Sequence, residues 1–134
     1  VDPSVLVTLL DSEITPVCAP FAATRSGALV NCNADAVAGA LAAALSADTL
    51  LLLSDIDQVR SQADDPSSAL SALSAADAQL LVSTGAARDG MKPKIEAALT
   101  ALAHGAQRVV IANGTRPHAV QRALDGSIPT TEMS

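Results

Sequence analysis

The feature that most constrains the fold of this chain is the alternation of short apolar runs with longer stretches of helical character. The four leucines after Thr49 are typical of a strand that is buried on both faces of a sheet. The stretch 33–46 instead has a cap in Asn33, an acid in Asp35 and an alanine-rich body, as helices do. We expect helices at 3–11, 33–46, 74–84, 92–104 and 117–124, and strands at 14–20, 28–32, 49–53, 108–112 and 128–131. This order predicts an α/β fold, a three-layer α/β/α sandwich with a mainly parallel sheet.

Composition bounds the size and class of the protein. The chain has 134 residues, the length of one ordinary domain, and we expect 1–134 to form a single domain. Apolar residues make up 49% of the chain, which excludes a disordered protein. Aromatic residues make up only 1%, which argues against a stacking platform for single-stranded nucleic acid or sugar.

The charge, hydropathy and cysteines of the chain limit the partners that it can bind and indicate the cell compartment in which it works. With a net charge of −6, the chain should repel nucleic acid and anionic membrane surfaces. The longest apolar stretch, 36–45, is far shorter than the roughly 20 residues that span a bilayer. Cys18 and Cys32 lie in apolar contexts, so we expect two buried free thiols and a cytoplasmic protein.

Polar residues follow several predicted strands, where an open α/β sheet binds its ligands. Asp35 follows the strand at 28–32, and Asp55 and Asp57 follow the leucine run. Each has an alternative explanation, because an acid also stabilises a helix start and aspartates are common in turns. The third such segment is 114–118.

The start of the predicted helix at 92–104 is a second candidate site. Lys92 and Lys94 lie there, and helix N-termini attract anions through their free N–H groups. The alternative is two solvated surface lysines. The sequence has neither a Walker A motif nor GxGxxG. His104 and His118 lack partners at metal spacing, so we expect no metal bound by the protein itself.

Four motifs in this order carry a family resemblance: LVNCNAD at 29–35, LLLSDI at 51–56, GMKPKIEAA at 90–98 and VVIANGTRPH at 109–118. Together they resemble the carboxyl-terminal half of the amino acid kinase family, most closely the kinases of acetylglutamate and of carrier-linked aminoadipate. The resemblance implies that Lys94 stabilises charge on the transferring phosphoryl group and that Asp35 organises the catalytic lysines. It also implies that Asn31 and Asn33 bind the substrate. The residues that it implies for binding Mg-ATP are Ser54, Asp55, Ile56, Asp57, Ala87, Arg88, Gly90 and Met91.

The same resemblance implies a kinase that phosphorylates the side-chain carboxylate of an N-acylated acidic amino acid. N-acetyl-L-glutamate of arginine biosynthesis is the first choice. Carrier-linked aminoadipate of lysine biosynthesis is the alternative, mildly disfavoured because an acidic chain suits an acidic carrier poorly. A non-catalytic nucleotide-binding or regulatory module is a further alternative, because Gln58 stands where the family has a glycine that permits close backbone approach. An unrelated Rossmann-like ligand binder is the remaining one.

The family's amino-terminal half has no counterpart in this sequence, which begins with Val1 rather than methionine. That half supplies a glycine-rich loop, a second lysine and most of the acyl-amino-acid pocket. We therefore expect a fragment of a longer chain, or a half that works with a partner chain, in a protein that forms homo-oligomers. A sheet divided in this way would leave an unpaired edge.

Overall fold

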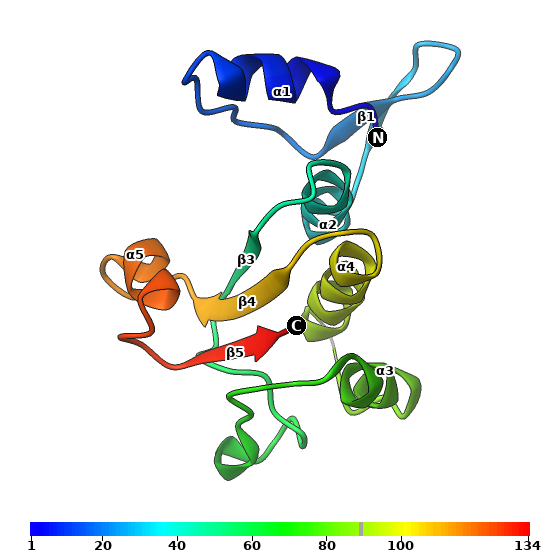
Figure 1. The fold of residues 1–134 in the computed structure, drawn as a ribbon. Helices are drawn as coiled ribbons and strands as arrows, with labels where there is room; N and C mark the ends of the chain where they lie inside the picture. The colour runs from blue at the N-terminus through cyan, green and yellow to red at the C-terminus, as the bar shows by residue number, and fades with distance from the viewer. Residues whose placement is uncertain (89) are drawn as a thin grey trace.

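The computed structural model describes residues 1–88 and 90–134 and has helices on both sides of a short sheet (Figure 1). Among these residues no helix is long and apolar enough to cross a lipid bilayer. The elements in chain order are α1 (Ser4–Asp11), β1 (Phe21–Ala23), β2 (Leu29–Asn31), α2 (Ala34–Ala44), β3 (Thr49–Ser54), a 3-10 turn (Pro66–Ser68), α3 (Ala75–Ser83), α4 (Met91–Ala103), β4 (Arg108–Asn113), α5 (Ala119–Leu124) and β5 (Thr130–Met133).

The central sheet has three strands in the order β3-β4-β5. The two apolar runs β3 and β4 pair in parallel, with Leu52 opposite Ile111, as the alternation of strands and helices predicts. The edge strand β5 runs antiparallel to β4 and begins two residues later than expected, at Thr130. On its other side, β3 pairs with no strand in the described part of the chain.

The sheet is covered on both faces, which confirms the three-layer α/β/α architecture. Side chains alternate across each strand, so Leu52 and Ile111 face one way and Val110 the other. The first pair packs in a core with α2, α3 and α4, whereas Val110 packs with Ala123 of α5. Figure 1 shows α2 and α4 on one side of β4 and α5 on the other.

Outside this core lie α1 and the antiparallel hairpin of β1 and β2 (Figure 1). The expected strand at 14–20 is wrong, because this segment has no strand and contains Pro16 and Pro20, which lack the backbone N–H that a ladder needs. The expectation of two buried thiols is also wrong. Cys18 is exposed and Cys32 half-buried, and both are free.

A close contact between α2 and α4 sets the position of both helices. A Cβ added at Gly39 would lie 2.7 Å from the carbonyl oxygen of Ala97, so only glycine lets the two backbones approach so closely. Asp35 lies one turn before Gly39 on α2, and Lys94 lies one turn before Ala97 on α4. The contact therefore brings the first turns of the two helices together.

Candidate active site

A cleft of about 610 Å³ opens where β3 ends. It is lined by the end of β3 and the loop after it, by the first turn of α2, and by the first turn of α4 with the residues that precede it. These segments are far apart in the sequence, and the parallel sheet and the α2–α4 contact bring them together. The cleft lies at the carboxyl end of β3, and α/β sheets commonly bind ligands at such strand ends.

Lys94 and Asp35 form an ion pair in this cleft. The Nζ atom of Lys94 lies 2.8 Å from Oδ1 of Asp35, and the two side chains are only 16% and 20% exposed. Lys92 instead lies on the surface, with its Nζ 3.9 Å from Oε1 of Glu96. Water screens the Lys94–Asp35 ion pair less than it screens the Lys92–Glu96 pair. We therefore expect only the Lys94–Asp35 pair to be firmly held.

The start of α4 lies at the same cleft. Its N-cap residue, Gly90, has no side chain that could accept from the first turn, and Pro93 lies within that turn. The start of α2 is different, because Oδ1 of Asn33 accepts a hydrogen bond from the Ala36 N–H. The Met91 N–H donates to the Arg88 carbonyl oxygen at 3.0 Å, and Pro93 has no N–H. The α4 terminus therefore favours an anion beside Lys94 chiefly through its helix dipole.

The loop after β3 forms one wall of the cleft. Ser54, Asp55 and Ile56 line it, and the Ser54 hydroxyl donates to Oδ1 of Asp55 at 3.3 Å. Arg60 also lines the cleft and adds a positive charge to it. Arg60 ends the segment 54–60 after this strand, where ligand contacts are expected from the sequence, although no individual role is predicted for it.

The segment before α4 forms the opposite wall. The cleft is lined here by Ala87, Arg88, Gly90 and Met91. Ala87 is buried and Met91 half-buried, so this wall has an apolar part. Asp89, between Arg88 and Gly90 in the sequence, lies outside the described residues. All four lining residues are therefore placed at the cleft, and their role in nucleotide binding stays a prediction.

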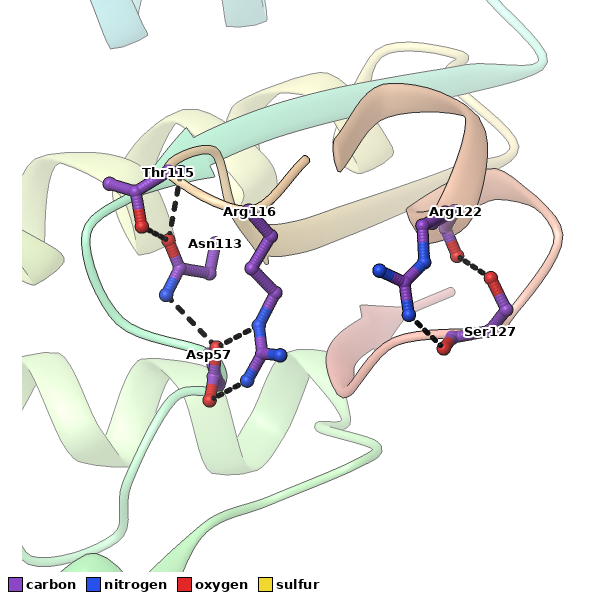
Figure 2. Close-up of polar contacts among 6 residues, drawn as sticks. All are labelled: Asp57, Asn113, Thr115, Arg116, Arg122 and Ser127. Carbon is purple, nitrogen blue, oxygen red and sulfur yellow. Dashed lines mark hydrogen bonds and ion pairs between the residues drawn. The ribbon is translucent and has the colours of Figure 1, made fainter. Parts of the chain in front are cut away.

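Two residues predicted for the site do not line the cleft. Asn31 ends β2 and is exposed. Asp57 accepts hydrogen bonds from Arg116, with Nε 2.8 Å from Oδ1 and Nη2 2.6 Å from Oδ2, and from Asn113 Nδ2 at 3.0 Å (Figure 2). These bonds, first to Arg116 and then to Asn113, lower the pKa of Asp57 to about 2. Asp57 thus makes contacts within the protein and does not line the cleft, and its role in nucleotide binding stays a prediction.

Comparison with known proteins gives a consistent family relationship. The model of the amino acid kinase family matches residues 1–113. The acetylglutamate kinase of Symbiobacterium thermophilum is 44% identical over 120 residues, which are 90% of this chain and 41% of that protein. The acetylglutamate kinase of Archaeoglobus fulgidus is 38% identical over the same shares. The chain thus spans about 40% of the length of the curated relatives that it matches.

Solved structures match nearly the whole chain. N-acetylglutamate synthase from Neisseria gonorrhoeae, complexed with coenzyme A and L-arginine, has a TM-score of 0.84 at 26% identity and covers 99% of this chain and 30% of that one. Carbamate kinase from Giardia lamblia bound to AMP-PNP has a TM-score of 0.77 at 20% identity and covers 98% of this chain and 44% of that one. At 20% identity, the likeness to carbamate kinase shows a shared fold and nothing more.

Proposed function

The chain belongs to the amino acid kinase family, and from this premise we propose that its cleft binds Mg-ATP as the nucleotide half of a kinase. The acceptor in this proposal is the side-chain carboxylate of an N-acylated acidic amino acid. The observation that carries it is the partly buried Lys94–Asp35 pair at the start of α4. The positive charge of Lys94 and the positive end of the α4 dipole thus lie together where a phosphoryl group would be transferred.

Phosphoryl transfer demands mostly positioning and charge compensation from a protein. The bond between the terminal phosphorus of ATP and its bridging oxygen breaks, a bond to a carboxylate oxygen forms, and ADP leaves. Lys94 would stabilise the negative charge on the transferring group. Asp35 would hold the Lys94 ammonium in place and need not act as a base, because an ionised carboxylate acceptor has no proton to lose.

The groups lining the cleft fit a magnesium-bound triphosphate. Lys94 and Arg60 offer donors to phosphate oxygens, and Asp55 is a carboxylate within reach of the same space. No cluster of three or more His, Cys, Asp or Glu side chains that could hold a metal ion forms among residues 1–88 and 90–134. Mg²⁺ suits a cleft that offers it a single carboxylate such as that of Asp55. This ion usually keeps several waters and binds through one or two carboxylates and the substrate's phosphates. When bound, it would neutralise part of the phosphate charge.

N-acetyl-L-glutamate is the acceptor that we propose, on the arginine pathway, and carrier-linked aminoadipate is the alternative. The names of the relatives at 38–44% identity support the first choice. We expect the pocket for the acyl amino acid to be contributed largely by a further segment or chain, since relatives are more than twice as long. We also propose that the protein assembles as a homo-oligomer and works in the cytoplasm, where free thiols such as Cys18 and Cys32 persist.

Isothermal titration with Mg-ATP tests the nucleotide site. Lys94→Ala should weaken binding about 10- to 100-fold, the loss expected for a charge-assisted contact. Lys92→Ala is the matched control, because Lys92 is a surface lysine of the same helix, and it should bind like the wild type. A folded wild-type chain that does not bind Mg-ATP would refute the nucleotide site. A phosphate-transfer assay of the naturally occurring protein with each of the two acceptors then separates them, and transfer to neither would refute both.

A further inference from the structure

Asp57, Asn113 and Arg116 form a cluster of polar contacts, here called the Asp57 clamp, that joins the loop after β3 to the loop after β4. Arg116 binds the Asp57 carboxylate through two nitrogens, Nε and Nη2, in the bidentate geometry that suits a guanidinium (Figure 2). Asn113 donates to the same carboxylate. Both carboxylate oxygens are therefore occupied by the protein.

The side-chain amide of Asn113 in the Asp57 clamp is itself held in one orientation. Oδ1 of Asn113 accepts from both the backbone N–H and the hydroxyl of Thr115, at 2.9 and 2.7 Å (Figure 2). A backbone N–H can only donate, so the amide oxygen of Asn113 must face Thr115. The amide nitrogen consequently faces Asp57, as a carboxylate requires.

The two strand ends that carry the clamp are joined by backbone as well. The N–H of Gly114 donates to the carbonyl oxygen of Ser54 at 2.8 Å. A Cβ at Gly114 would lie 2.9 Å from the Cβ of Leu53, so the close approach depends on glycine. The loop that carries Arg116 is thereby fixed relative to the end of β3.

The loop 54–60 has two further anchors beyond the clamp. The Gln58 side chain donates to the carbonyl oxygen of Thr130 at 2.9 Å, and the Val59 N–H donates to the Thr131 hydroxyl at 2.9 Å. Gln58 thus ties the loop to β5 at the position where the family resemblance leads one to expect glycine. Ser54, Asp55, Ile56 and Arg60, on either side of the anchored residues, line the cleft.

We infer that Asp57 and Arg116 are positioning residues that hold the loop 54–60 in its nucleotide-binding conformation without touching the nucleotide themselves. This inference rests on the proposed nucleotide site. Neither residue lines the cleft, and the Asp57 carboxylate bonds to Arg116 and Asn113 outside that space. The clamp acts on binding by keeping Ser54, Asp55, Ile56 and Arg60 where they line the cleft.

Mg-ATP titration and melting temperature of Asp57→Asn, Arg116→Gln and the double variant test the clamp. Each single change should weaken Mg-ATP binding about tenfold, the usual size of a coupling between sites, and the double variant should be no weaker than either single one. Arg122→Gln is the matched control. Arg122 makes its hydrogen bonds to Ser127 near the end of α5 and not to the loop (Figure 2), so this variant should keep wild-type affinity.

The possible outcomes separate the clamp from the proposed function. Unchanged affinity in both single variants, with the wild type binding and Lys94→Ala weakened, overturns the clamp alone. A loss confined to Arg116→Gln also overturns it, because Arg116 would then contact the nucleotide directly. A melting temperature that falls while affinity holds assigns Asp57 and Arg116 a purely structural role. Failure of the folded wild type to bind Mg-ATP removes the proposed nucleotide site and the clamp's role with it.

Discussion

The Nζ atom of Lys94 lies 2.8 Å from Oδ1 of Asp35, although the two residues are 59 positions apart in the sequence. The pair joins the first turn of α2 to the first turn of α4 at the cleft. Two charged groups that are each largely shielded from water hold one another in place more firmly than surface pairs do. This geometry suits a lysine whose effect depends on where its ammonium group is held and not on its charge alone.

Asp35→Asn should slow phosphoryl transfer while leaving Mg-ATP affinity close to that of the wild type. The amide keeps the size of the side chain but no longer attracts the Lys94 ammonium, and a misplaced catalytic group costs about 100-fold in rate. Single-turnover transfer and isothermal titration measure the two effects separately. Glu96→Gln, on the exposed face of α4, is the control and should transfer normally. An unchanged rate in Asp35→Asn would exclude a role for Asp35 in positioning Lys94.

Gly39→Ala should destabilise the fold even though alanine is the better helix former. The added Cβ would meet the backbone of Ala97 on α4, and overpacking of this kind costs about 1–3 kcal/mol. Urea unfolding measures the loss. Gly90→Ala serves as comparison, because a Cβ there meets nothing within 4 Å. Equal stability of the two variants would show that α2 and α4 can separate without cost.

The stabilisation provided by Asp57 should depend on pH in the acidic range. Its pKa in the folded chain is lowered to about 2, below the ordinary 3.8, chiefly by Arg116. The stabilisation is therefore complete above about pH 4 and is lost as the pH falls through the folded value. The effect should be small, because the side chain is 40% exposed.

Denaturation of the wild type and Asp57→Asn between pH 7 and pH 2 measures this dependence. The wild type should be the more stable at pH 7, and the gap should narrow as the pH falls below about 4. Asp64→Asn, at a side chain that is 96% exposed, should show no such change. A gap that stays constant down to pH 2 would contradict the assignment.

Thr131→Val should cost about 1–3 kcal/mol of folding free energy, because it leaves the buried N–H of Val59 without its acceptor. The Thr131 hydroxyl also donates to the carbonyl oxygen of Leu70, so one side chain satisfies two backbone groups. Chemical denaturation measures the loss. The control is Thr130→Val, because Thr130 meets Gln58 through its backbone carbonyl, which the substitution keeps. Similar losses at both positions would show that the hydroxyl of Thr131 is not what matters.

Elements with a strong local pattern were predictable from the sequence. The leucine run of β3 and the capped, alanine-rich α2 carry their periodicity within a few residues. The apolar run 14–20 has the composition of a strand but not the backbone donors, because two prolines interrupt it. Apolar content alone therefore misleads where hydrogen-bonding capacity is missing.

The candidate site was predictable where a residue lies at a strand end or a helix start, as Asp35 and Lys94 do. It was not predictable where a long-range partner decides the direction of a side chain. Asp57 follows the same strand as Asp55, yet Arg116, from a distant loop, holds it out of the cleft. A single sequence shows that both charges exist but not that they meet.

The free side of β3 has a practical consequence for work with this protein in solution. Along the six residues Thr49–Ser54, backbone groups on that side find no strand partner in the described part of the chain. Such an edge is a template for pairing with a strand of another molecule. We therefore expect self-association to grow with concentration, and nucleotide affinities are best measured on dilute samples whose monodispersity light scattering has verified.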